Sequence, residues 1–349
     1  MRALVLHGPH DARVDDVEPP LAAAGEVVVD AERVGICGTD VEFYTGEMAY
    51  LRQGHATYPL RIGHEWAGRV RTLGSGVDPS WLGKRVTSDT MLGCGVCDRC
   101  RRGRHHVCEF RHEIGVRGGW PGALAEQLVV PASALYEIPE SVSLTAAALV
   151  EPGATAVRAI NAASLDPGYR LLILGPGAIG LLVAQFALAR GVEVHIVGIE
   201  DAGLELARSM GVHDARLLAE MNDSPLSTFD AVIDATNDAG IPAASLRWVE
   251  PAGRLVLVGL AGQPSLIDSR EITLGDVTVV GILGGSAGIA EAIASYATGQ
   301  VVPDVLVSEV VSLDEVASRL GGRRGPSAGI GPKVHVDPRI TNSSQVTKV

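Results

Sequence analysis

The sequence predicts an α/β protein of two domains, a β-rich N-terminal module and a doubly wound parallel sheet covered by helices. Three observations lead to this prediction: a length of 349 residues, a change of sequence texture near residue 155, and a glycine-rich turn that follows an apolar strand. A chain of this length exceeds what one hydrophobic core usually supports, so two domains are expected.

The first 150 residues have the texture of a β-rich module. Short aliphatic and β-branched runs, such as residues 26–30 and 128–130, alternate with frequent Gly, Pro and Asp. Such runs predict short strands joined by loops.

From about residue 155, apolar strands alternate with Ala- and Leu-rich helical segments, which predicts a parallel sheet with covering helices. Strands are expected at 169–174, 192–197, 229–235, 254–258 and 277–282, and helices at 179–190, 204–210, 243–248 and 287–297. Short strands follow at 305–311 and 333–336, and we expect this C-terminal part to pack back on the first domain. The polar tail at 341–349 is expected to be frayed.

Charge and composition narrow the function. The net charge of -12, from 41 acidic and 29 basic side chains, disfavours nucleic acid and membrane surfaces as partners. The N-terminus lacks the apolar run of a signal peptide, and no segment offers roughly 18 uninterrupted apolar residues. We therefore expect a cytoplasmic protein. Its five cysteines, an odd number, argue against a disulfide framework and favour metal binding or catalysis.

The glycine-rich turn predicts a dinucleotide site. Its sequence is Gly175-Pro176-Gly177-Ala178-Ile179-Gly180. Gly175 permits a tight turn, Gly177 lets the backbone approach a pyrophosphate, and Gly180 lets helix and strand pack closely. The free N–H groups at the helix N-terminus would then bind the phosphates. A glycine turn without a ligand is the alternative.

The end of the second strand of this unit bears on the choice of cofactor. An acidic residue about 20 positions after the glycines normally binds the ribose hydroxyls. Gly198 at that place would leave room for a 2′-phosphate, but no Arg or Lys stands beside it and Glu200 would repel one. We therefore expect NAD, with NADP as the alternative.

A cluster of four cysteines predicts a structural zinc site. Its members are Cys94, Cys97, Cys100 and Cys108. Four thiolates at this spacing can surround one tetrahedral zinc ion. A four-iron cluster is the rival, but its last spacing is usually shorter and its last cysteine is commonly followed by Pro, whereas Glu109 follows here. The surrounding Arg and His side chains would offset the thiolate charge or form a solvated face. A zinc ribbon for nucleic acid is disfavoured by the acidity of the chain.

The fifth cysteine and a histidine form a second polar constellation. Cys37 lies in the segment 35–40, and His64 lies in Gly63-His64-Glu65. Cys, His and carboxylates can hold a catalytic zinc that keeps one position open for substrate. Taken singly, one Cys and one His are more often core residues.

Together these motifs resemble the zinc-containing medium-chain dehydrogenases over nearly the whole chain. The shared features, in the family's order, are Cys37-Gly38-Thr39-Asp40, Gly63-His64-Glu65, the four-cysteine lobe, Glu151-Pro152 and the glycine turn. The chain looks closer to the sorbitol, threonine and glucose dehydrogenase branch than to ethanol dehydrogenases. The reason is that Glu65 and Glu151 stand where that branch has zinc-site carboxylates.

The resemblance implies the domain organisation. A GroES-like catalytic domain would comprise residues 1–152, with a structural zinc lobe at 93–109. A Rossmann domain would comprise residues 153–285, and residues 286–349 would return to the catalytic domain and form the tail. The active cleft would lie between the domains, and the protein would form a homodimer or homotetramer.

The resemblance also implies roles at the catalytic zinc, the second of two zinc ions per chain. Cys37 and His64 would be ligands, Glu65 a third ligand, and Glu151 a ligand or a water-mediated partner. Asp40 would orient His64. The alternatives are a turn cap for Asp40 and a helix N-terminal acid for Glu151.

The implied reaction is hydride transfer from an alcohol held as an alkoxide on zinc to the nicotinamide. Thr39 matches the hydroxyl that begins the family's proton relay. Many relatives have a histidine five residues after the zinc cysteine, and here Glu42 stands instead. Glu42 could replace that base, bind an amine or hydroxyl of the substrate, or face solvent.

We therefore expect a dehydrogenase of a secondary alcohol such as a polyol, sugar or aminocyclitol. A ketone reductase with the same machinery is an alternative, because hydride transfer is reversible. A catalytically idle zinc-binding scaffold is another.

Overall fold

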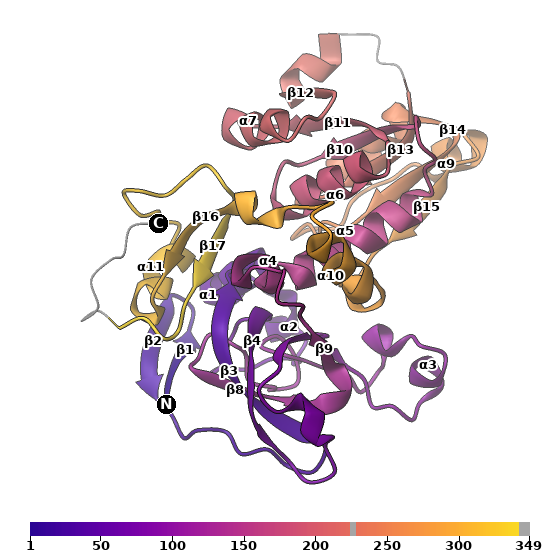
Figure 1. Cartoon of the computed structure of the whole chain (residues 1–349). Helices are drawn as coiled ribbons and strands as arrows, with labels where there is room; N and C mark the ends of the chain where they lie inside the picture. The colour runs from indigo at the N-terminus through magenta and orange to yellow at the C-terminus, as the bar shows by residue number, and fades with distance from the viewer. Residues whose placement is uncertain (224–227, 342–349) are drawn as a thin grey trace. The chain divides into compact units, whose positions relative to one another are not determined.

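The computed structural model describes residues 1–223 and 228–341, which form two compact units (Figure 1). Unit 1 consists of Met1–Glu151, Val307–Gly329 and the described residues from Lys333 onward, and unit 2 consists of Pro152–Leu306 and Ile330–Pro332. Apart from Thr341, the tail expected to be frayed lies outside the described residues. In the ranges that the structure describes, every helix is too short or too polar to cross a bilayer.

Unit 1 is built on a seven-stranded sheet in the order β16-β17-β3-β4-β5-β9, with β8 also paired to β3. Its strands are β3 (Glu26–Gly35), β4 (Glu65–Leu73), β5 (Arg85–Ser88), β8 (Gln127–Pro131), β9 (Leu135–Glu137), β16 (Val307–Val311) and β17 (Lys333–Val336). The long strand β3 pairs antiparallel with β4, β8 and β17. The C-terminal return of the chain therefore reaches the strand that leads directly into Cys37.

Short elements complete unit 1. The strands are β1 (Arg2–Gly8), β2 (Asp11–Asp16), β6 (Met91–Leu92) and β7 (His112–Glu113), and the helices are α1 (Gly38–Thr45), α2 (Ala49–Arg52), α3 (Asp98–Arg101), α4 (Leu144–Ala148) and α11 (Val316–Leu320). Short 3-10 turns lie at Pro79–Trp81, His105–Val107, Ala132–Ala134 and Leu313–Glu315. Phe43 of α1 and Trp66 of β4 are fully buried in one hydrophobic core, so α1 is anchored to the sheet beside which the candidate site lies.

Unit 2 is a six-stranded parallel sheet in the order β12-β11-β10-β13-β14-β15. Its strands are β10 (Arg170–Leu174), β11 (Glu193–Gly198), β12 (Asp214–Leu217), β13 (Phe229–Asp234), β14 (Val249–Leu257) and β15 (Thr278–Gly281). This order is that of a doubly wound dinucleotide-binding sheet. From β10 the chain adds β11 and β12 on one side, and it then crosses over to add β13, β14 and β15 on the other side. The α/β fold class expected from the sequence is confirmed.

Helices cover this parallel sheet, as burial of both its faces requires. They are α5 (Val150–Ala163), α6 (Ala178–Ala189), α7 (Asp201–Ser209), α8 (Ile241–Ser245), α9 (Ser269–Leu274) and α10 (Ile289–Ala297), with 3-10 turns at Leu218–Asp223, Leu246–Trp248, Ser286–Gly288 and Pro303–Leu306. Helices α6 and α7 contact β10 to β12, whereas α8 contacts β13 and β14. Strand β12 and helices α5 and α9 are additions to the elements expected from the sequence.

The C-terminal limit of unit 2 differs from the expected domain limit. Residues 286–306, expected in the return segment, belong to unit 2, and the chain re-enters unit 1 only at Val307. Helix α10 packs tightly on α5, since a Cβ on Gly288 would lie 2.2 Å from the carbonyl oxygen of Ala154. The apolar face of α10 is buried, with Tyr296 stacked on Phe186 of α6, which explains why this helix stays with the parallel sheet.

Candidate active site

Three strand ends of unit 1 meet where the candidate site lies. Gly35, the last residue of β3, is paired with Glu65, the first residue of β4. Beyond it, the N–H group of Ile36 donates to the carbonyl oxygen of Val334 in β17, at 3.0 Å. The register of the sheet thus brings together segments that lie far apart in the sequence.

Cys37, His64 and Glu65 gather at this corner. One potential ligand atom of each lies within 4.8 Å of those of the other two. His64 is 7% exposed and Glu65 is 1% exposed. The Nδ1 atom of His64 is buried and has no hydrogen-bond partner among the residues that the structure describes. A thiolate, an imidazole and a carboxylate are the donors that zinc prefers.

The electrostatics of this corner favour a cation. Burial disfavours the charged form of His64, yet the Cys37 thiol and the carboxylates of Asp40 and Glu151 raise the pKa of His64 well above its usual range. Groups that hold a proton on an imidazole also attract a divalent metal ion, which competes with that proton. The residues present therefore fit a zinc ion.

Asp40 ties the two loops together through their backbones. Its Oδ2 accepts a hydrogen bond from the N–H of Cys37 at 2.8 Å, and its Oδ1 accepts one from the N–H of Gly63 at 3.1 Å. The first of these bonds is part of a capping box at the start of α1. Oδ1 is 3.8 Å from Nδ1 of His64, beyond hydrogen-bond distance. The alternative of a cap is therefore seen directly, and Asp40 acts on the imidazole through its charge rather than through a hydrogen bond.

Lys333 is a site residue that the sequence reasoning did not identify. Its ammonium nitrogen contacts both carboxylate oxygens of Glu65, with Oε2 at 2.6 Å, and donates to the carbonyl oxygen of Ile36 at 3.2 Å. Although burial opposes the charge of Lys333, Glu65 and Cys37 raise its pKa. Gly35 makes room for this pair, because a Cβ there would lie 2.3 Å from Oε2 of Glu65. A lysine that alternates with valine in a short C-terminal strand is the signal that could have pointed to it.

Three further residues predicted at the site are Glu151, Thr39 and Glu42. Thr39 and Glu42 follow Cys37 closely in the chain, and the charge of Glu151 acts on His64. Glu151, in the first turn of α5, stands outside the group of three ligand atoms. Burial, reinforced by the charges of Glu65 and Asp89, raises its pKa to about 7. Thr39 and Glu42 lie one turn apart on α1, and both are partly exposed. Burial and then the charge of Glu47 raise the pKa of Glu42.

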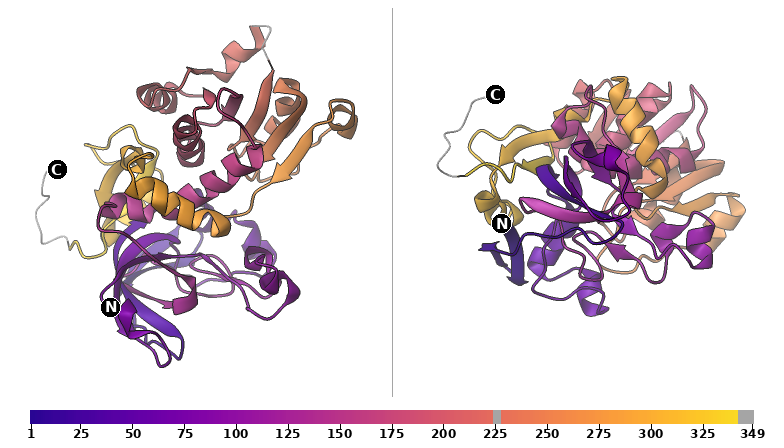
Figure 2. Two further views of the ribbon diagram at one scale, coloured as in Figure 1. Left: turned by 45° about the vertical axis from the view of Figure 1, so that its right-hand side comes forward. Right: turned by 60° about the horizontal axis from the view of Figure 1, so that its bottom comes forward.

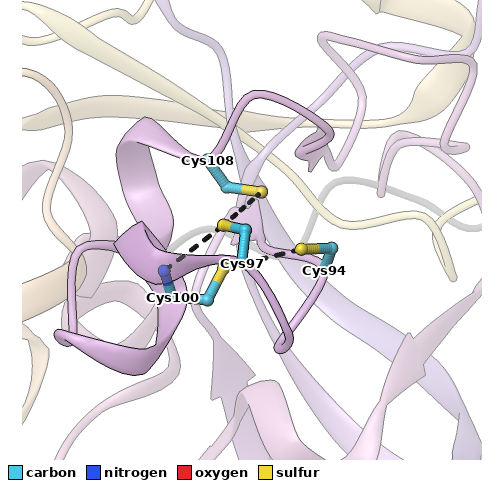
Figure 3. Close-up of side chains that lie close together, drawn as sticks. All are labelled: Cys94, Cys97, Cys100 and Cys108. Carbon is cyan, nitrogen blue, oxygen red and sulfur yellow. Dashed lines mark hydrogen bonds between the residues drawn. The ribbon is translucent and has the colours of Figure 1, made fainter.

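The four-cysteine lobe brings its sulfur atoms together around α3 (Figure 3). All four sulfurs lie within 4.8 Å of one another. Cys94 and Cys100 are 4.0 Å apart, and Cys97 and Cys108 are 3.8 Å apart, about twice the length of a disulfide bond. Figure 3 shows the four side chains converging on one point, as ligands of one tetrahedral ion would.

The charges of this lobe also require a cation. Backbone N–H groups of Val96 and Cys97 lower the pKa of Cys94 to about 6, whereas burial and the neighbouring sulfurs raise that of Cys100 to about 12. Four thiolates cannot all be charged unless a metal ion compensates them. The four arginines of the lobe, Arg99, Arg101, Arg102 and Arg104, are exposed. They therefore lie on a solvated face, while His105 pairs with Asp89 at 2.7 Å.

The glycine turn of unit 2 has the geometry expected of a phosphate-binding loop. Gly175 follows β10 with φ +99, and Gly177 is the N-cap of α6. A Cβ on Gly180 would lie 1.9 Å from the carbonyl oxygen of Gly175, so only glycine fits between helix and strand. In contrast, no described residue lies within 4 Å of a Cβ placed on Gly177. The chain thus leaves space at the position where a pyrophosphate would approach the backbone.

The end of β11 differs from the expectation of an open space at Gly198. A Cβ on Gly198 would lie 2.6 Å from Cγ of Pro176, so Pro176 fills that space. Glu200 is exposed and forms the N-cap of α7. Pro176 of the glycine turn therefore lies directly against Gly198, and a side chain at position 198 would not fit.

Two family models match this chain. The alcohol dehydrogenase GroES-like domain matches residues 23–140, and the zinc-binding dehydrogenase domain matches residues 178–298. The first match includes Cys37, His64 and the cysteine lobe, and the second begins within the glycine turn.

Two curated relatives are dehydrogenases of small hydroxylated molecules. The L-threonine 3-dehydrogenase of Idiomarina loihiensis is 32% identical over 296 residues, which cover 81% of this chain and 84% of that enzyme. The sorbitol dehydrogenase of Bacillus subtilis is 30% identical over 326 residues, which cover 90% of this chain and 91% of that enzyme.

Two solved structures share the whole fold. An alcohol dehydrogenase of E. coli CFT073, complexed with NADH, has a TM-score of 0.87 at 26% identity and covers 97% of this chain and 99% of its own. A zinc-binding dehydrogenase of Sinorhizobium meliloti 1021, bound to NADP, has a TM-score of 0.87 at 28% identity, with the same coverage.

Proposed function

The chain belongs to the zinc-dependent medium-chain dehydrogenases and is a nicotinamide-linked alcohol oxidoreductase, and on this basis we propose that its substrate is a small, polar secondary alcohol. A polyol, a sugar or an aminocyclitol would fit. The carrying observation is the half-buried carboxylate of Glu42, on the helix that begins beside Cys37, together with the similarity to a threonine and a sorbitol dehydrogenase. Carboxylates accept hydrogen bonds from hydroxyl and ammonium groups, which a simple alkyl alcohol lacks beyond its reacting carbon.

A substrate panel tests this proposal. Zinc-replete protein is assayed with polyols, sugars, aminocyclitols and amino alcohols, and with ethanol and 2-butanol as simple alcohols. We expect kcat/KM for the best hydroxyl-rich substrate to exceed that for 2-butanol by about tenfold or more, since each satisfied charged hydrogen bond contributes about 1.5–3 kcal/mol. Equal or better turnover of the simple alcohols would overturn the proposal.

Cys37 and His64 are proposed to hold the catalytic zinc, with Glu65 as a third donor shared with Lys333 and Glu151 as a ligand or water-mediated partner. When bound, zinc supplies the Lewis acidity that lowers the pKa of a substrate hydroxyl. The backbone bonds of Asp40 keep the Cys37 and His64 loops in register, which positions both ligands.

The protein's own residues also offer a route for the proton. Thr39 and Glu42 are three positions apart on α1, so their side chains lie on one face of that helix. Glu42 is half-buried with a raised pKa, which makes its carboxylate a stronger base than that of an exposed glutamate. We assign Thr39 the first step and Glu42 the second, in place of the histidine found in many relatives.

NAD is proposed as the preferred cofactor, although the solved relatives include one with NADH and one with NADP. The support is local: Pro176 fills the space at Gly198, and the exposed Glu200 would repel a 2′-phosphate. Steady-state kinetics with both cofactors tests this, and a preference for NADP would overturn it.

A homodimer or homotetramer is part of the proposal. Strand β15 is at the edge of its sheet, and Leu266 and Leu274, which precede it in the chain, are 92% and 88% exposed. An unpaired edge and exposed leucines favour pairing with a second copy. Light scattering after size exclusion tests this.

A cytoplasmic location is also proposed, because all five cysteines are free thiols that metal binding requires to stay reduced.

A further inference from the structure

Arg158 of α5 holds the loop that follows the last strand of the parallel sheet. Its Nη1 donates to the carbonyl oxygens of Leu283 and Gly284, each at 2.5 Å. Strand β15 ends at Gly281, and the next residue, Ile282, still donates its N–H to the carbonyl oxygen of Leu257 in β14 at 3.0 Å before Leu283 and Gly284 follow. The loop 282–285 therefore leaves the sheet and bends at once towards α5.

The shape of the loop depends on this contact. Two successive carbonyl groups converge on one nitrogen only where the chain turns sharply, and Gly284 has the left-handed φ of +63 that this turn requires. Without the guanidinium, the two converging carbonyl oxygens would lose the hydrogen-bond donor that they share. Arg158 is thus the element that fixes the turn.

The far end of the loop is fixed to the same helix by close packing. Residues Ser286–Gly288 follow the loop, and a Cβ on Gly288 would lie 2.2 Å from the carbonyl oxygen of Ala154. A Cβ on Gly153 would lie 1.9 Å from the hydroxyl oxygen of Tyr296 in α10. Figure 2 shows α5 in magenta beside α10 in orange. Helix α5 is therefore a rigid support for the loop.

The position of the loop after β15 indicates which part of a bound cofactor it would contact. In this strand order a dinucleotide lies across the carboxyl ends of the strands, with its pyrophosphate at the turn after β10. The adenosine ribose reaches the end of β11, so the adenosine half lies over β10 to β12. The nicotinamide half then lies over β13 to β15, where the loop 282–285 emerges.

We propose that Arg158 is a positioning residue for the nicotinamide half of the cofactor. It holds the backbone groups of the loop 282–285 in the arrangement that meets the nicotinamide, while it leaves the adenosine half untouched. This inference rests on the dinucleotide site proposed above, at the glycine turn of residues 175–180.

Binding of two ligands separates the two halves of the site. Dissociation constants are measured by calorimetry for NADH and for ADP-ribose, which lacks the nicotinamide, or for their 2′-phosphorylated counterparts if the wild-type protein binds those more tightly. For Arg158→Met we expect affinity for the reduced cofactor to fall by about tenfold, the effect of losing one charged hydrogen-bond donor, with ADP-ribose affinity unchanged within about twofold. Arg158→Lys should show a smaller selective loss.

Arg254→Met is the matched control. Arg254 also donates to a carbonyl oxygen of α5, that of Ala162 at 3.2 Å, but it lies on β14 and away from the loop. We expect it to leave the ratio of the two dissociation constants unchanged. Gly284→Ala, which strains the turn and keeps Arg158, should reproduce the selective loss and covers the case in which Arg158→Met does not fold.

The outcomes are distinguishable. Equal weakening of both ligands by Arg158→Met and Gly284→Ala, or no weakening of either ligand, would overturn the role of Arg158. A wild-type protein that binds neither ligand, or that keeps its affinity for ADP-ribose when Gly177 is replaced by Val, would instead overturn the proposed dinucleotide site and the inference with it.

Discussion

The ammonium nitrogen of Lys333 lies 2.6 Å from Oε2 of Glu65, and both side chains are almost fully buried. The same nitrogen donates to the carbonyl oxygen of Ile36, so this ion pair also fixes the strand end that leads into Cys37. A carboxylate held in this way is shared between a lysine and any metal ion bound beside it. The pair therefore couples the C-terminal return of the chain to the proposed zinc site.

Lys333→Met is expected to destabilise the metal-free protein by about 3–5 kcal/mol, because Glu65 would be left as an unpaired buried charge. The loss should shrink with zinc bound, since the ion then neutralises Glu65. Denaturant unfolding of variant and wild type, each with EDTA and with zinc, measures both effects.

Lys84→Met is the control for Lys333→Met. Lys84 forms an exposed ion pair of the same 2.6 Å length with Glu137, and the loss of that pair should cost less than about 1 kcal/mol. If metal-free Lys333→Met were no less stable than metal-free Lys84→Met, the buried pair would not have the role described here.

The proton route predicts different effects for two neighbouring carboxylates. Because the base must be deprotonated, the rate of alcohol oxidation should rise with pH through the pKa of Glu42. Glu42→Gln should remove this rising limb of the pH–rate profile and lower kcat by about tenfold or more. Glu47→Gln removes a charge that raises the pKa of Glu42, so it should move the limb to lower pH while preserving kcat at high pH. A pH–rate profile that is the same in all three proteins would exclude Glu42 from the route.

His105 predicts a pH-dependent stability in the cysteine lobe. Its hydrogen bond to Asp89 raises its pKa above the usual 6.5. A raised pKa means that the folded state binds the proton more tightly. The contribution to stability is therefore complete below the unfolded pKa and is lost as pH rises through the folded pKa.

The comparison for this prediction is His105→Gln, which cannot titrate. The melting temperature of the wild type minus that of His105→Gln should be largest well below about pH 6.5 and should decrease as the pH rises through the raised pKa of His105. A difference that stays constant across this range would show that the pair contributes no proton linkage.

The sequence was sufficient for most of the fold because the parallel sheet is built from apolar runs that alternate with Ala- and Leu-rich helices. Strand β12, with the sequence Asp214-Ala215-Arg216-Leu217, was missed since it lies at the sheet edge and needs no apolar run. Helix α9 is short and mostly exposed, so it has no apolar stripe to recognise. The start of β14 was hidden by Pro251 and Gly253, which usually interrupt strands.

At the site, the motifs were sufficient for residues whose neighbours in the chain are distinctive, such as Cys37 and His64. They were insufficient for Lys333, because its contact with Glu65 depends on β17 pairing with β3, and 268 positions separate the two residues. For Asp40 the motif left two roles open, an orienting partner of His64 and a turn cap, since the directions of the backbone N–H groups that it binds are determined only by the folded loops.

Whether Cys37 and His64 bind one shared ion can be read from cobalt-substituted protein, because thiolate ligands give intense charge-transfer absorption and the coordination geometry sets the visible bands. The cysteine lobe supplies a constant reference in every sample. We predict that Cys37→Ser loses part of the charge-transfer band, that His64→Ala changes the visible bands, and that each variant binds about one metal ion fewer per chain than the wild type. Full metal content with unchanged spectra in both variants would contradict the zinc site on which the proposed chemistry depends.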